Sequence, residues 1–111
     1  MEISENRAGE VTVVEVKGRI DSNTARAFGE RLTSLIKDGR ARLVVDLKQI
    51  IYISSAGFRS LLIIGKSIKS AQRKLVLCGM ASEVQRVFDI AMFNEIFTIC
   101  SSREDAAQQA K

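Results

Sequence analysis

Strand-like and helix-like hydrophobic patterns alternate along this chain, and this alternation restricts the fold more than any other feature. Short apolar runs rich in β-branched residues predict strands. Apolar residues that recur every three or four positions predict helices. The predicted strands are residues 11–17, 42–47, 74–78 and 96–99, with a further strand over 2–7 that pairs with the first across a turn at 8–10.

We therefore predict a single α/β domain over residues 1–111, with a four- to five-stranded mixed sheet. The sheet is expected to be parallel after the first hairpin, because helices separate the later strands. About four helices should pack on this sheet. The tail after Arg103 is polar and alanine-rich, and it is expected either to fray or to form a final helix that begins at residues 102–105.

Capping residues indicate where the helices begin and end. A cluster of N-cap residues at 21–24 precedes the apolar stripe of the first predicted helix. Gly39 follows this stripe, at the position where a glycine in the left-handed conformation ends a helix. Residues 82–85 match a capping box at the start of a third helix. The apolar face of that third helix is predicted to consist of Val84, Val87, Phe88, Ala91 and Met92.

Composition excludes several kinds of function. The chain contains no histidine, which removes the commonest general base and the commonest metal ligand. No phosphate-binding glycine loop and no GxSxG elbow occurs in the sequence. We therefore expect neither an enzyme nor a bound cofactor or metal.

Charge and cysteine usage indicate the compartment and the class of partner. The net charge is +4, but the 17 Lys and Arg residues are spread along the chain, which disfavours direct nucleic-acid binding. Cys78 and Cys100 lie in apolar runs and are expected to act as small hydrophobes, since their spacing matches no zinc or redox motif. Without a secretory signal a cytoplasmic location is expected, and the apolar stretch 61–64 is too short for membrane insertion.

Two loops, residues 18–23 and 52–57, connect predicted strands to predicted helices. Functional groups of α/β proteins collect at such places. Ser54 and Ser55 stand directly before the second helix, whose N-terminus favours a negative group. A phosphate on Ser55 would add about −1.5 to −2 charge, and Arg59 is near enough in sequence to screen it.

A simpler interpretation is that these polar residues only cap helices. Serines before helices are usually N-caps, with a contribution of about 1 kcal/mol. Ser54 could be the cap while Ser55 points outward, so that both interpretations hold. Asp21 is likewise a candidate cap, and Asp46 is expected to bond to backbone N–H groups at the sheet edge.

Three stretches carry a family resemblance: VTVVEVKGRIDSNTARAF, LVVDLKQIIYISSAGFRSLL and KLVLCGMASEVQRVFDIAMFNEIF. Through them the chain, from about Val11 to Ile99, resembles a STAS domain and specifically the bacterial anti-sigma factor antagonists. The middle stretch is the most specific. In it an apolar strand ends in Asp-Leu, an aromatic residue follows, and Ser-Ser-Ala-Gly comes after it. The resemblance implies a STAS-like fold and transcription regulation by partner switching.

The resemblance also implies the partners and the site. The unphosphorylated protein is expected to bind an anti-sigma factor that is an ATP-using serine kinase. Phosphorylation of Ser55 should end this binding, and a serine phosphatase of the PP2C type should reset it. Ser54 replaces the usual acid of the family motif and is a competing acceptor. The expected partner-binding residues are Asp21, Ser22, Asn23, Ser54, Ala56, Gly57, Phe58 and Arg59, of which Ala56 replaces a usual hydroxyl residue.

Two alternatives remain open, because fold alone does not determine function. STAS domains also occur in anion transporters and lipid-transport complexes, so the chain is alternatively a non-switched interaction subunit of such an assembly. The other alternative is a nucleotide-binding regulatory module without chemistry.

Overall fold

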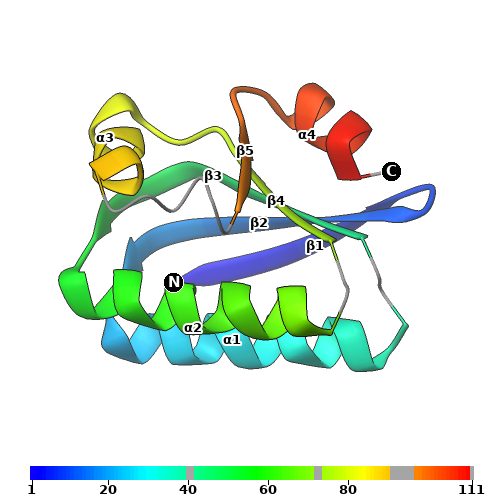
Figure 1. Cartoon of the computed structure of the whole chain (residues 1–111), viewed down its shortest axis with the longest axis horizontal. Coiled ribbons are helices and arrows are strands. Elements are labelled where there is room, and N and C mark those ends of the chain that lie inside the picture. Colours follow the sequence, from blue (N-terminus) through cyan, green and yellow to red (C-terminus); the bar gives the residue numbers. More distant parts are fainter. Residues whose placement is uncertain (40–41, 72–73, 91–96, 111) are drawn as a thin grey trace.

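A computed structural model describes residues 1–39, 42–71, 74–90 and 97–110. The alternation of strands and helices predicted from the sequence is confirmed (Figure 1). In chain order the elements are β1 (Glu2–Ala8), β2 (Val11–Ile20), α1 (Ser22–Lys37), β3 (Arg42–Ile53), α2 (Ser55–Ser70), β4 (Lys74–Cys78), α3 (Ser82–Ile90), β5 (Thr98–Cys100) and α4 (Arg103–Ala110).

The five strands form one sheet in the order β1-β2-β3-β4-β5. β1 and β2 form an antiparallel hairpin, and every later neighbour is parallel. Gly9 allows the tight turn of this hairpin because its φ of 66° lies in the left-handed region. The predicted mixed sheet, parallel after the first hairpin, is therefore confirmed.

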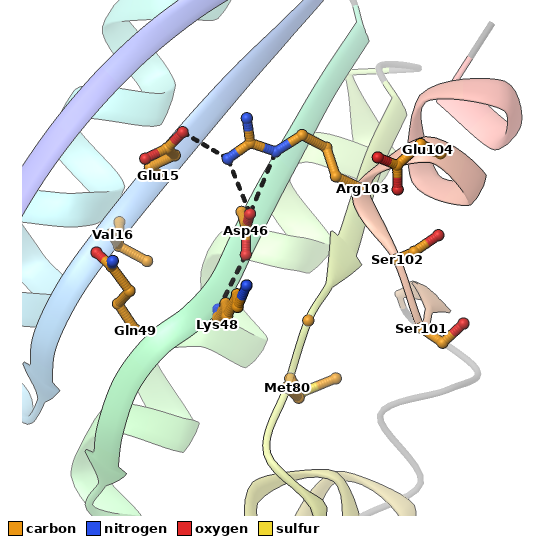
Figure 2. Close-up of a pocket in the computed structure, with 11 residues that line it drawn as sticks. Glu15, Val16, Asp46, Lys48, Gln49, Met80, Ser101, Ser102, Arg103 and Glu104 are labelled. Atoms are coloured by element: carbon orange, nitrogen blue, oxygen red, sulfur yellow. Dashed lines mark hydrogen bonds and ion pairs between the residues drawn. The ribbon is translucent and has the colours of Figure 1, made fainter.

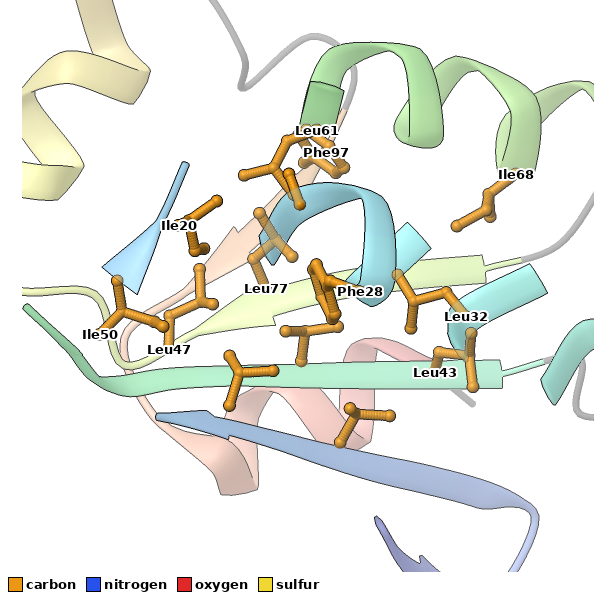
Figure 3. Close-up of a cluster of buried hydrophobic side chains, with 14 of the residues drawn as sticks. Ile20, Phe28, Leu32, Leu43, Leu47, Ile50, Leu61, Ile68, Leu77 and Phe97 are labelled. Carbon is orange, nitrogen blue, oxygen red and sulfur yellow. The ribbon is translucent and has the colours of Figure 1, made fainter. Parts of the chain in front are cut away.

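Helices cover both faces of the sheet (Figure 1). α1 and α2 lie side by side on one face, whereas α4 lies on the other. β3 is buried on both faces, so Leu43 and Val45 face α1 and α2 while Val44 faces α4. Figure 3 shows the larger apolar cluster, in which side chains of α1 and α2 pack against side chains of β3 and β4. The helices contribute Phe28, Leu32, Leu61 and Ile68, and the strands contribute Leu43, Leu47 and Leu77.

β2 and β3 extend beyond their predicted ends at residues 17 and 47. Gly18 follows the predicted strand 11–17 directly, and it continues β2 with a φ of 117°. The ladder between β2 and β3 shifts register near Glu15 and again near Gly18. These irregularities interrupt the alternation of apolar and polar residues, so the second half of each strand has no regular pattern in the sequence.

Of the two outcomes expected for the tail, the described residues form the final helix, α4. Ala106 and Ala110 are fully buried against the sheet, so tertiary contacts stabilise a helix of low intrinsic hydrophobicity. β5 occupies Thr98–Cys100, where the sequence predicted a strand over 96–99. Residue 96 lies outside the described residues, as do Ala91 and Met92 of the predicted third-helix face.

α3 begins one residue earlier than its capping pattern predicts. Ser82 is already helical, and the Gln85 N–H donates to the Ala81 carbonyl at 2.9 Å. Phe88 is fully buried on the face predicted for this helix. Within the described ranges, no helix has both the length and the apolar character that crossing a bilayer requires.

Candidate functional site

The two predicted loops meet where β2 and β3 end and α1 and α2 begin. The Ser54 N–H donates to the Ile20 carbonyl oxygen at 2.8 Å, which joins the start of α2 to the end of β2. β2 and β3 are parallel and in register at Ile20 and Ile53, so both helices start at the same end of the sheet. The expected gathering of polar groups at strand carboxyl ends is therefore present.

Gly57 allows this close approach. It is buried, and a Cβ built on it would lie 2.6 Å from the Ile20 carbonyl oxygen. Any side chain at position 57 would therefore push α2 away from β2. Because it is enclosed in this way, Gly57 shapes the predicted partner-binding surface from below and does not itself offer contact area.

Ser54 and Ser55 have different surroundings. Ser54 is the N-cap of α2, and its half-buried Oγ accepts a hydrogen bond from the Gly57 N–H at 3.0 Å. Ser55 is the first residue of α2 and is exposed. The arrangement foreseen from the sequence, with Ser54 as cap and Ser55 outward, is confirmed. Of the two hydroxyls, Ser55 is the one that an enzyme can reach freely.

The first turn of α2 suits a negative group. Among the described residues, none accepts a hydrogen bond from the N–H groups of Ser55 or Ala56. Unpaired N–H groups and the helix dipole make this end electropositive. Arg59 is exposed one helical turn after Ser55, on the same side of the helix. The surroundings of Ser55 are therefore electropositive.

Asp21 caps α1 next to this site. Its Oδ1 accepts hydrogen bonds from the N–H groups of Asn23 and Thr24, each at 3.0 Å, and the Asp21 N–H donates to Thr24 Oγ1 at 2.8 Å. The hydrogen bonds that the Asp21 carboxylate accepts, the one from the Thr24 backbone foremost, lower the pKa of Asp21. Ser22 and Asn23 are exposed in the same turn. Asp21 therefore fulfils the predicted capping role and stays ionised beside the start of α2.

Phe58 lies behind this surface. Its ring contacts the buried Phe88 of α3 edge-on, with 5.0 Å between ring centroids. Only part of Phe58 remains exposed, so most of this predicted partner-binding residue is used to hold α3 against α2.

Three exposed residues near the predicted loops were not named as site residues from the sequence, although Arg19 and Tyr52 lie within these loops. Ile51 and Tyr52 are 77% and 46% exposed at the end of β3. Arg19 of β2 pairs with Tyr52 in the ladder, and its guanidinium carbon lies 4.7 Å from the ring centroid. Only the register of β2 and β3 shows that Tyr52 forms a surface with Arg19.

A second polar cluster lies on the α4 face of the sheet (Figure 2). Arg103, at the start of α4, donates hydrogen bonds to Glu15 of β2 and to Asp46 Oδ2 of β3, the latter from Nη2 at 2.9 Å. Asp46 Oδ1 accepts from the Lys48 N–H at 2.9 Å. Asp46 thus has the predicted backbone bond, but in a central strand instead of at the sheet edge. These groups line a pocket of about 600 Å³.

Sequence reasoning did not identify Glu15 and Arg103 as partners. They are separated by 88 positions, and no local pattern connects them. Hydrogen bonds to Glu15 and Asp46 raise the pKa of Arg103. In the described part of the chain, no three side chains of metal-binding type are grouped to hold a metal ion.

Known proteins resemble this chain in sequence and in fold. Residues 2–106 match the family model for the STAS domain. The chain is 33% identical over 111 residues to BtrV of Bordetella bronchiseptica, named as an anti-sigma factor antagonist, with 100% of this chain and 96% of that protein covered. A crystal structure of an anti-sigma factor antagonist from Thermotoga maritima superposes with a TM-score of 0.87 at 17% identity, covering 97% of this chain and 93% of that one.

The fold also matches a structure solved with its phosphate. The Bacillus cell fate determinant SpoIIAA, in its phosphorylated form, superposes with a TM-score of 0.72 at 12% identity. This match covers 99% of this chain and 100% of SpoIIAA. At such identity the likeness concerns the fold.

Proposed function

The chain belongs to the STAS domain family, in the branch of the anti-sigma factor antagonists, and on this premise we propose that it is a partner-switching protein controlled at Ser55. In its unphosphorylated form it binds an anti-sigma factor serine kinase. Phosphorylation of Ser55 releases it, and a serine phosphatase restores binding. The protein acts in the cytoplasm as a ligand of other proteins and catalyses no reaction itself.

The observation that carries this proposal is the position of the Ser55 side chain. Ser55 is exposed at the first position of α2, while Ser54 provides the cap. A kinase can therefore modify Ser55 without breaking the bond that begins the helix. The arrangement supports Ser55 over Ser54 as the acceptor, because the Ser54 Oγ is half-buried and engaged by Gly57.

The physical basis of the switch is a difference between the free and the bound surface. A phosphate adds about −1.5 to −2 charge. In the free protein, water, the electropositive end of α2 and Arg59 accommodate this charge. In a docked interface the same charge loses its water, and an unpaired buried charge costs several kcal/mol. The polar surface formed by Asp21, Ser22 and Asn23 lies beside Ser55 and supplies the rest of the docking area.

The site assignment is tested by mapping phosphate on the tagged protein isolated from its native bacterium. Wild type and Ser54→Ala are expected to carry one phosphate at residue 55, located by peptide mass spectrometry. Ser55→Ala is expected to carry none. Phosphate that persists on the Ser55→Ala protein at Ser54 would transfer the acceptor role to that residue and contradict the proposal.

The binding half of the proposal is tested with the kinase recovered on the unphosphorylated protein. Ser55→Asp should weaken its binding at least about tenfold, which corresponds to about 1.4 kcal/mol. Ser54→Asp is the matched control, because it adds the same charge one residue earlier and retains a capping side chain. Equal affinities of the two variants would show that charge at residue 55 has no special effect.

A further inference from the structure

Four side chains that ionise or react form a row across the sheet. Glu15 pairs with Asp46, Asp46 pairs with Cys78, and Cys78 pairs with Cys100, so that the row crosses β2, β3, β4 and β5. Residues paired directly in neighbouring strands point to the same face. Arg103 occupies the acidic end of the row. The two cysteines occupy the other end, and both are free thiols.

The pairing brings the two thiols within reach of each other. Neighbouring strands lie about 4.8 Å apart, and disulfides join Cα atoms separated by about 4.4–6.8 Å. β5 is a three-residue strand at the edge of the sheet, so it is paired on one side only. Because only β4 holds it within the sheet, β5 can adjust its position as the bond forms.

The two thiols differ in access. Cys78 is completely buried between the sheet and α4. Cys100 is partly exposed and lines a pocket of about 370 Å³ between β5 and α3. A small oxidant can therefore reach Cys100 first, and Cys78 is then the nearest thiol.

We propose that Cys78 and Cys100 form an intramolecular disulfide under peroxide stress, which fastens the edge strand β5 to β4. This site is independent of the proposed partner switch. Cys100 loses its proton and the thiolate attacks peroxide, so that the S–O bond forms and the O–O bond breaks. The hydroxide that leaves takes up the released proton, and the products are a Cys100 sulfenic acid and water. The Cys78 sulfur then attacks the Cys100 sulfur. The S–S bond forms, the S–O bond breaks, and the hydroxyl leaves as water with the proton of Cys78.

Burial keeps this pair reduced in the absence of peroxide. Desolvation raises the pKa of Cys78 to about 11 and also raises the pKa of Cys100. The thiolate is the reactive form, so both groups react slowly at neutral pH. The bridge is therefore a response to excess oxidant, in keeping with the transient disulfides found in reducing compartments.

The bond would restrain more than β5. It closes a loop from Cys78 to Cys100 that contains α3, and closing a loop removes conformations from the unfolded chain. We expect the thermal midpoint to rise by at least about 5 °C in the oxidised protein. Amide hydrogen exchange in β5 should slow at least about tenfold.

The test is to treat the whole protein with hydrogen peroxide, block the remaining thiols with N-ethylmaleimide, and digest it with trypsin without reductant. Cleavage after Arg86 places Cys78 in the peptide 75–86 and Cys100 in the peptide 87–103. The expected product is these two peptides joined and lighter by two hydrogen atoms, from a protein that runs as a monomer on a non-reducing gel.

Two variants define the controls. Cys78→Ala should accumulate sulfinic acid or intermolecular dimers at Cys100, and Cys100→Ser should leave Cys78 reduced. The proposal is overturned if wild-type Cys100 oxidises while the two peptides stay separate, or if they are joined only between two chains. It is also overturned if Cys78 oxidises as fast in Cys100→Ser as in the wild type.

Discussion

At the scale of single residues, two glycines lie where a helix packs closely against a neighbouring element. A side chain at either position would meet that element. Gly57 is enclosed by backbone, since its Cβ would lie 2.6 Å from the Ile20 carbonyl oxygen. Gly29 lies where α1 meets α2, and its Cβ would lie 2.8 Å from Ile64 Cδ1. A carbonyl within a strand cannot move independently, whereas the end of an isoleucine side chain can rotate.

We therefore expect opposite outcomes from the same substitution at these two glycines. Gly57→Ala should destabilise the protein by about 1–3 kcal/mol, because α2 must shift away from β2. Gly29→Ala should be close to neutral, because the helix propensity of alanine offsets the displacement of Ile64. Urea unfolding measures both. A Gly57→Ala protein as stable as the wild type would show that α2 moves freely at its start.

At the scale of elements, the dipole of α2 determines where negative charge is tolerated. Its N-terminal turn contains Ser55 and no acidic residue, and its last turn contains Lys69. Negative charge is favourable at the N-terminal end of a helix and unfavourable at the C-terminal end. Both Ser55 and Ser70 are exposed, so burial does not complicate the comparison.

We expect Ser55→Asp to leave stability unchanged or to raise it by up to about 1 kcal/mol, and Ser70→Asp to lower it by a similar amount. The sign reversal follows from the position along one helix. Thermal unfolding at low salt measures it, and high salt should reduce both effects. A clear loss of stability in Ser55→Asp would indicate that a phosphate there disrupts the fold, which is contrary to a switch confined to the surface.

At the scale of the whole molecule, Arg103 joins three parts of the chain that are remote in sequence. Its guanidinium contacts Glu15 and Asp46, whose side chains are 39% and 11% exposed. It separates two acids that are directly paired in adjacent strands. Without it, like charges would face each other at a partly buried position. The Arg42–Glu10 pair joins β3 to the hairpin but lies in solvent.

Arg103→Met should therefore cost about 1–2 kcal/mol at neutral pH, whereas Arg42→Met should cost at most about 0.5 kcal/mol. The deficit of Arg103→Met should shrink at high salt, because salt screens the repulsion between the two carboxylates. Urea unfolding of both variants at low and at high salt measures this difference. A deficit that does not change with salt would assign the role of Arg103 to packing instead of charge.

The sequence alone determined what depends on contiguous residues. Alternating periodicities predicted the order of elements and the mixed sheet, and the local residues at 21–24 and 54–57 predicted the helix starts, the Ser54 cap and the outward Ser55. These features arise within one or two turns of chain, where side-chain spacing and backbone hydrogen bonds act directly.

Only the tertiary structure decided what depends on register. Three features each need two elements aligned to within one residue. They are the contact of Gly57 with Ile20, the stacking of Arg19 on Tyr52, and the pairing of Cys78 with Cys100. A shift of one residue turns every side chain of a strand to the other face. Register is set by the packing of the whole sheet against its helices, so no local pattern contains it.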